Sequence, residues 1–173
     1  FRHGLEGETE LEFSARRAQQ LEQMIIREGA DTVAAFIAEP VLGAGGVVPP
    51  PRGYFEAIQK VLKRFDILFI VDEVVCGYGR LGKWFGSELY DLKPDMMTTA
   101  KALTSGYFPY SASFVSEEIW ELVKEGSVKY GNFVHGYTYA GHPIGAAVAM
   151  ANLDIIEKEN LVDNAATVGA YFH

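Results

Sequence analysis

Two short apolar segments, each followed by a charged residue, constrain the fold of this chain most strongly. The first, residues 67–71, is followed by Asp72 and Glu73, and the second, residues 96–99, is followed after one alanine by Lys101. Segments of this length and character are typical of strands that are buried on both faces of a parallel sheet. A buried charge without a partner is costly, so opposite charges at the ends of two such strands are expected to act together.

Segments of helical periodicity alternate with these strands. Two more strands are predicted, at 32–38 and 110–115. Helices are predicted from the spacing of apolar residues at 8–28, 54–65, 116–124, 143–159 and from 165 onward. The segments predicted to be irregular are 42–51, 77–86 and 126–139. The alternation predicts an α/β fold, a three-layer and mostly parallel sheet with helices on both faces.

In such sheets, ligands bind outside the carboxyl ends of the strands. Glu39, Asp72 and Lys101 each follow a predicted strand directly or after one residue, so all three are expected at that edge. The chemistry that places a lysine and an aspartate around one ligand is catalysis with pyridoxal phosphate. In that chemistry a lysine holds the cofactor aldehyde as a Schiff base, and an aspartate pairs with the pyridine nitrogen.

Composition narrows the possible partners. A length of 173 residues suffices for one domain with a core, and the net charge of −8 argues against nucleic acid. No apolar segment is long enough to span a membrane, so no membrane partner is expected. The single cysteine, Cys76, excludes an internal disulfide and fits a reducing compartment such as the cytoplasm. The chain starts at Phe1 rather than at a methionine, so we expect that Phe1 is not the natural N-terminus.

Two glycine-rich motifs suggest other functions, and both are weak. Residues 77–84 nearly match the phosphate-binding loop of nucleotide hydrolases, after an acidic strand that resembles their second motif, but Trp84 replaces the hydroxyl residue that would hold Mg²⁺. Gly77, Gly79 and Gly82 match a dinucleotide-binding pattern, but no helix begins directly after them as that site requires. A tight structural loop is the preferred interpretation.

No metal site is predicted. The four histidines are scattered along the sequence. Together with the single cysteine, they do not have the spacing of a zinc site. His135 and His142 are interpreted as structural polar contacts, and Cys76 as a small packed side chain.

Four segments together resemble the class III pyridoxal-phosphate aminotransferases of fold type I. They are Phe36-Ile37-Ala38-Glu39-Pro40 with 43–46, Asp72-Glu73-Val74 through 77–82, the segment 94–106 around Lys101, and the segment 135–143. Their order and spacing fit the family and span most of the chain. Residues 105–107 and 135–143 are most similar to the branch that acts on ω-amino acids or on amines with pyruvate.

The resemblance implies a role for each matching residue. Lys101 would be the Schiff-base lysine, and Asp72 would pair with the ring nitrogen. Val74, expected on the same side of the strand as Asp72, would pack on the ring face. Thr138 would bind the cofactor phosphate of a neighbouring subunit, and Tyr137 would line that neighbour's substrate pocket. Glu39 would also lie near the substrate.

The resemblance further implies an internal part of a longer enzyme. Residues 1–160 would belong to the large, pyridoxal-phosphate-binding domain, and 161–173 would begin the connection to a C-terminal small domain. The enzyme would move an amino group from an amine or ω-amino acid to a keto acid such as pyruvate, as a homodimer or tetramer with sites shared between subunits. The isolated segment is expected to be inactive. The alternatives are another fold type I enzyme, either an aminomutase or a decarboxylase, and an inactive fragment that serves only in assembly.

Overall fold

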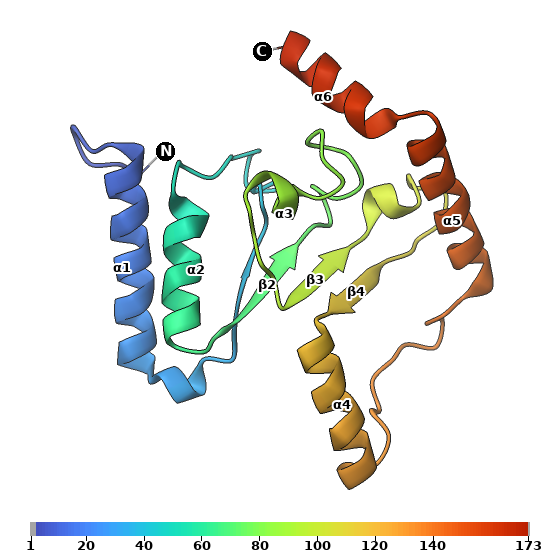
Figure 1. The fold of residues 1–173 in the computed structure, drawn as a ribbon, viewed down its shortest axis with the longest axis horizontal. Coiled ribbons are helices and arrows are strands. Elements are labelled where there is room, and N and C mark those ends of the chain that lie inside the picture. Colours follow the sequence, from blue (N-terminus) through green and yellow to red (C-terminus); the bar gives the residue numbers. More distant parts are fainter. Residues whose placement is uncertain (1–2, 173) are drawn as a thin grey trace.

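The computed structural model describes residues 3–172, so Phe1, Arg2 and His173 lie outside the described part (Figure 1). Strands and helices alternate along most of the chain. The strands are β1 (Ala35–Ala38), β2 (Leu68–Asp72), β3 (Met96–Thr99) and β4 (Ala112–Val115). The α-helices are α1 (Glu10–Glu28), α2 (Tyr54–Arg64), α3 (Gly86–Leu89), α4 (Glu117–Tyr130), α5 (Pro143–Lys158) and α6 (Leu161–Tyr171).

The four strands form one sheet in the order β1-β2-β3-β4. The first three are parallel, and β4 runs antiparallel to β3. In the register, Ala38 is opposite Val71, and Asp72 is opposite Thr98. The carboxyl ends of β1, β2 and β3 therefore lie at the same edge. This arrangement confirms the predicted α/β class with a mostly parallel sheet flanked by helices.

The hydrophobic core lies between the sheet and the helix pair α1 and α2, which pack side by side (Figure 1). From β2, Phe69 and Val71 point into this core, and from α2, Phe55 and Ile58 do so. The apolar positions of α2 recur at three- and four-residue intervals, so one face is apolar and faces the sheet. Burial of these side chains drives the first half of the chain to fold against β2.

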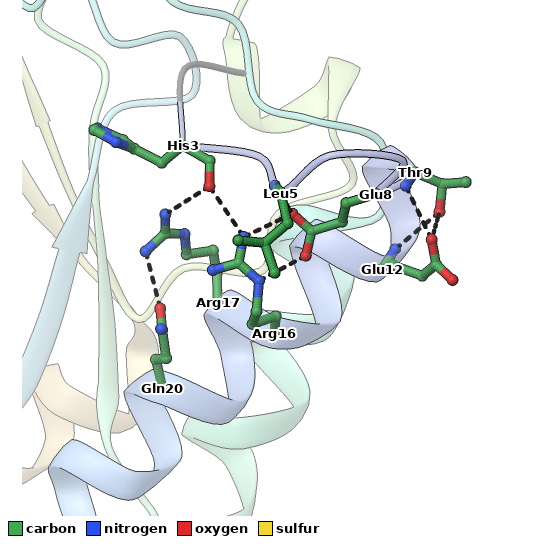
Figure 2. A network of polar contacts seen from close by, with 8 residues as sticks. All are labelled: His3, Leu5, Glu8, Thr9, Glu12, Arg16, Arg17 and Gln20. Carbon is green, nitrogen blue, oxygen red and sulfur yellow. Dashed lines mark hydrogen bonds and ion pairs between the residues drawn. The ribbon is translucent and has the colours of Figure 1, made fainter.

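Helix α1 begins at a dense network of polar contacts (Figure 2). The Thr9 hydroxyl oxygen accepts from the Glu12 amide, and the Glu12 carboxylate accepts from the Thr9 amide, which is the reciprocal pattern of a capping box. The Glu8 carboxylate accepts two hydrogen bonds from the Arg16 guanidinium, both at 2.6 Å. This pairing holds the pKa of Glu8 well below its usual value, at about 2. The segment before α1 is thereby fastened to the helix surface.

The second half of the chain is packed less closely. Helices α4 and α6 contribute no buried residue, and on β4 the side chains of Phe114 and Val115 are 46% and 41% exposed. Helix α5 is the exception. Its Gly145 packs on the rings of Tyr110 and Phe108, where an added Cβ would lie 2.5 Å from the Tyr110 ring.

Most predicted boundaries agree with the structure within three residues, with two exceptions. Helix α6, predicted from residue 165 onward, begins at Leu161. The helix predicted to stop at Lys124 continues to Tyr130, so 126–130 are helical rather than irregular. Helix α6 packs against the glycine-rich loop, where an added Cβ on Gly82 would lie 2.8 Å from the Ala166 Cα. The proposed domain boundary after residue 160 stays a prediction. No helix in the part of the chain described, residues 3–172, is both long and apolar enough to cross a membrane.

Candidate active site

Three of the predicted site residues meet at the carboxyl edge of the sheet. Asp72 is the last residue of β2, Glu39 follows the last residue of β1, and Lys101 stands two residues beyond the end of β3. The register places Asp72 opposite Thr98, so the aspartate and the lysine-bearing turn lie at the ends of adjacent parallel strands. The topology therefore brings an acid and a primary amine to the edge where parallel sheets bind ligands.

The neighbouring carboxylates of Asp72 and Glu73 have contrasting surroundings. Glu73 is fully buried and accepts three hydrogen bonds, from the amides of Gly86 and Ser87 and from the Ser87 hydroxyl. It thus anchors the N-terminus of α3, where unpaired amides favour a negative charge. Asp72 is half-buried, and within residues 3–172 it accepts one hydrogen bond, from the Val74 amide at 2.9 Å. Glu73 is structural, and Asp72 keeps an oxygen for a ligand.

Lys101 opens a short 3₁₀ turn, Lys101–Leu103, and its backbone has φ 45°, in the left-handed region. The residue is exposed. Among residues 3–172 it forms no ion pair with Asp72. The turn lifts Lys101 off the strand, which leaves its amine accessible.

Val74 does not continue strand β2. The strand ends at Asp72, and Val74 lies in the turn that follows, because the Asp72 side chain binds the Val74 amide two residues on. The expectation that Val74 and Asp72 point to the same side by strand alternation is therefore wrong. A contact of Val74 with a cofactor ring stays a prediction.

Glu39 binds its own loop. Its Oε2 accepts from the Gly43 amide at 2.8 Å, and the same glycine lies against the Val75 side chain, with an added Cβ 3.1 Å from Val75 Cγ2. The loop after β1 is in this way fastened to the turn after β2. A role for Glu39 in a substrate pocket stays a prediction.

A hydroxyl pair that the sequence analysis missed connects the two strand ends. The Tyr78 hydroxyl, on the turn after β2, donates to Thr99 Oγ1 at 3.0 Å, and Thr99 is the last residue of β3. Burial raises the pKa of Tyr78, so its hydroxyl stays protonated and able to donate. The only signal for this pair in the sequence was a tyrosine within a glycine-rich loop that follows an acidic strand end.

Tyr137 and Thr138 lie elsewhere, on the segment 131–142 that runs from the end of α4 back to α5 (Figure 1). Both side chains are exposed, Tyr137 to 81%. The structure does not bring them together with Asp72 and Lys101 within one chain. Their predicted action in a neighbouring subunit stays a prediction.

Cys76 and His142 have the structural roles that the sequence analysis gave them, whereas His135 is exposed and its interpretation stays a prediction. Cys76 is 1% exposed, and burial raises the pKa of its thiol, which disfavours a nucleophilic thiolate. His142 caps α5, with its Nδ1 accepting from the Ile144 amide. The glycines at 77–82 form turns, and Gly79, at φ 99°, lies against Val162 of α6. Across residues 3–172 no group of His, Cys, Asp or Glu is arranged to hold a metal ion.

Comparison with known proteins decides the family. The sequence profile described as "Aminotransferase class-III" matches residues 4–173. The chain belongs to the class III aminotransferase family. The predicted resemblance is thereby confirmed.

Relatives that are similar to this chain are named as transaminases. The chain is 57% identical to a diaminobutyrate–2-oxoglutarate transaminase of Halomonas elongata, over 96% of this chain and 35% of that protein. It is 52% identical to the mitochondrial gamma aminobutyrate transaminase 1 of Solanum lycopersicum, over 99% of this chain and 33% of that protein. The chain thus spans about a third of the length of these relatives.

Solved transaminases share the fold closely. A structure from work on ancestral reconstruction of transaminases superposes with a TM-score of 0.96 at 56% identity, over 98% of this chain and 37% of that one. The ω-transaminase of Pseudomonas jessenii, in complex with PMP, gives a TM-score of 0.96 at 48% identity, over 98% of this chain and 37% of that one. These matches confirm that residues of this chain have the fold of the class III transaminases.

Proposed function

We propose that this chain is part of a pyridoxal-phosphate-dependent aminotransferase that moves an amino group from an amine or ω-amino acid to a keto acid such as pyruvate. The observation that carries the proposal is the meeting of Asp72 and Lys101 at the ends of adjacent parallel strands. Family membership and the relatives' names support amino transfer, and the PMP bound in a similar structure supports the cofactor.

The donor set fits that cofactor. A half-buried carboxylate with an oxygen available suits a protonated ring nitrogen, and an exposed amine on the turn after the next strand suits an aldehyde. When bound, pyridoxal phosphate supplies the aldehyde that takes up the amino group and a ring that accepts electrons. The Val74 amide orients the Asp72 carboxylate, which would keep a proton on the ring nitrogen. Lys101 Nζ would hold the cofactor and, once released, move a proton at the substrate carbon.

Peptide mapping tests the lysine directly. In a complete protein that contains this segment, borohydride reduction after pyridoxal phosphate binding should label Lys101, the lysine at the carboxyl edge beside Asp72. Label on Lys83 or Lys93 instead would overturn the assignment.

A second test concerns the aspartate. Asp72→Asn should retain cofactor but lower kcat about 10²- to 10³-fold, the loss typical of one preorganised electrostatic contact.

A donor panel tests the substrate class. The named relatives act on γ-aminobutyrate and diaminobutyrate, which both carry a terminal amine. We expect turnover with γ-aminobutyrate or a simple primary amine, and pyruvate as acceptor. An enzyme that released CO₂ or isomerised its substrate without an acceptor would be a decarboxylase or an aminomutase, and the aminotransferase proposal would fail.

The proposal includes a shared site in a homodimer or tetramer. Its support is the exposure of Tyr137 and Thr138 on a segment apart from the carboxyl edge. Mixing inactive Lys101→Ala subunits with weakened Thr138→Ala subunits should restore activity, because one hybrid site then holds both native residues. No restoration would indicate a site built within one chain.

The single cysteine supports a reducing compartment such as the cytoplasm, although some relatives are named as mitochondrial or chloroplastic.

A further inference from the structure

Asn152, in the middle of α5, binds the turn that carries Lys101. Its Nδ2 donates to the Ala102 carbonyl at 2.7 Å and to the Leu103 carbonyl at 3.2 Å, and its Oδ1 accepts from the Ser105 hydroxyl at 2.7 Å. The orientation of the amide is fixed chemically, because carbonyl oxygens only accept hydrogen bonds. One side chain thus makes three contacts with a segment about fifty positions away in the sequence.

These contacts complement the turn's own hydrogen bonds. Three carbonyls of the segment accept backbone amides from within it, namely those of Ala100, Lys101 and Thr104. Asn152 donates to the two carbonyls that lie between those of Lys101 and Thr104, which are the carbonyls of Ala102 and Leu103. The turn is therefore held from inside by its backbone and from outside by one amide of α5.

The segment needs such support because its backbone is strained at both ends. Lys101 has φ 45° and Ser105 has φ 49°, both in the left-handed region that residues other than glycine rarely adopt. Strained residues of this kind persist where the surrounding structure fixes them. Asn152 makes its contacts between these two positions, so it resists relaxation of the turn.

Asn152 is placed for this contact by the packing of α5. On the inward face of the helix, Gly145, Ala149 and Ile156 are buried, and Asn152 falls on the same face. Gly145 brings the helix close to the Tyr110 and Phe108 rings. Partial burial of the polar Asn152 side chain in this apolar stripe is costly, and its hydrogen bonds to the carbonyls opposite offset that cost.

We propose that Asn152 is a positioning residue that holds the Lys101 turn in the conformation in which the amine meets the cofactor. This rests on the proposed function of Lys101. Without Asn152 the turn would sample relaxed conformations, and Lys101 would reach the reacting atoms less often. The expected loss is therefore in the rate of chemistry, with little change in binding of the amine donor.

The experiment compares Asn152→Ala, Asn152→Asp and Ser105→Ala in a complete protein containing this segment, with Asn164→Asp on the exposed face of α6 as control. Asn152→Asp keeps the acceptor for Ser105 but loses both amide donors, and Ser105→Ala removes a single contact. We expect kcat to fall about 10- to 100-fold in Asn152→Ala and less in Ser105→Ala, with KM for the donor nearly constant. The control should behave as the unaltered protein.

Two further readouts separate positioning from general stability. In protein without cofactor, amide hydrogen exchange at 101–106 should be faster in Asn152→Ala than in the control, while exchange in α2 is unchanged. Asn152→Asp should recover activity as pH falls, because a protonated carboxyl donates one hydrogen bond to a carbonyl. Asn152→Ala has no such group, so its pH profile should not show this recovery.

The outcomes distinguish the two proposals. Unchanged exchange at 101–106 together with unchanged kcat in both Asn152 variants would overturn the positioning role. If Asn152→Ala does not fold, the pH dependence of activity in Asn152→Asp tests the proposal instead. An activity loss in this variant that does not recover at lower pH would contradict the positioning role. Absence of borohydride label at Lys101 in the unaltered protein would refute the proposed function, while the exchange data would still show whether Asn152 holds the turn.

Discussion

Helices α2 and α4 both mix apolar and charged residues, but the apolar residues gather on one face more clearly in α2, and the two helices have opposite surroundings. In α2, four of 11 residues are buried against the sheet and α1. In α4, none of 14 residues is buried, and Trp120 and Leu122 are 48% and 63% exposed. The contrast shows that the first half of the chain builds its own core, while the second half presents apolar side chains outward. Exposed apolar side chains are typical of surfaces that contact other protein, so we expect association through the second half of the chain.

The largest expected difference between the two regions is in stability. Ile58→Ala should lower the free energy of unfolding by about 2–5 kcal/mol, because it leaves a cavity in the core between α2 and β2. Leu122→Ala should lower it by less than about 1 kcal/mol, since its side chain is largely in solvent. Urea unfolding of both variants measures the comparison. An equal loss in Leu122→Ala would mean that α4 is buried in the folded protein.

A smaller loss is expected at the buried carboxylate behind the site. Glu73→Gln should lower the free energy of unfolding by about 1–3 kcal/mol, because an amide NH₂ group would face the donors of Gly86 or Ser87. The exposed Glu125→Gln on α4 is the matched control and should be nearly neutral. Chemical denaturation checks both. A neutral Glu73→Gln would show that the N-terminus of α3 is held by other contacts.

The outward-facing second half is expected to associate. The 173-residue chain alone should elute larger than a compact monomer, or be insoluble, and should show no transaminase activity with pyruvate and an amine. Val128→Glu, at a residue that is 91% exposed, should shift elution toward the monomer. Lys129→Glu beside it changes the charge without removing apolar surface, so its shift should be smaller. An active, monomeric chain would contradict both expectations.

The smallest expected effect is a pH dependence confined to the start of α1. The Arg16 hydrogen bonds lower the pKa of Glu8 from its usual 4.5 to about 2 in the folded chain, so this pair stabilises above pH 4.5. Its contribution is lost as pH falls from 4.5 toward 2. Glu8→Gln should therefore show a shallower loss of stability across this interval than the unaltered chain, whereas Glu6→Gln should not. Thermal melts at a series of pH values test the difference.

The sequence predicted the elements that local patterns specify. Strand Met96–Thr99 and the start of α5 at Pro143 agree with the predictions, because a strand-length run and a helix-initiating proline are local signals. The end of α4 was missed because Gly126 was taken as a break. One glycine costs a helix only about 1 kcal/mol, and the helix ends instead before Gly131, at φ 92°.

The sequence predicted those parts of the candidate site that follow from the positions of the strand ends. Asp72 and Lys101 lie at the edge that the βαβ pattern implies, but the exposure of Lys101 and the turn at Val74 depend on side-chain hydrogen bonds. The contacts of Tyr78 and Asn152 join residues far apart in the chain, and sequence periodicity does not encode such pairs. A lone asparagine on the buried face of a small-residue helix was the available signal for Asn152.

The left-handed backbone at Lys101 has a consequence for engineering. Its φ of 45° is a conformation that glycine adopts more readily, so a search for thermostable variants would favour Lys101→Gly. That variant would relieve the backbone strain and lose the amine on which the proposed chemistry depends. A screen for heat resistance alone does not protect this lysine, so its retention requires a simultaneous screen for turnover.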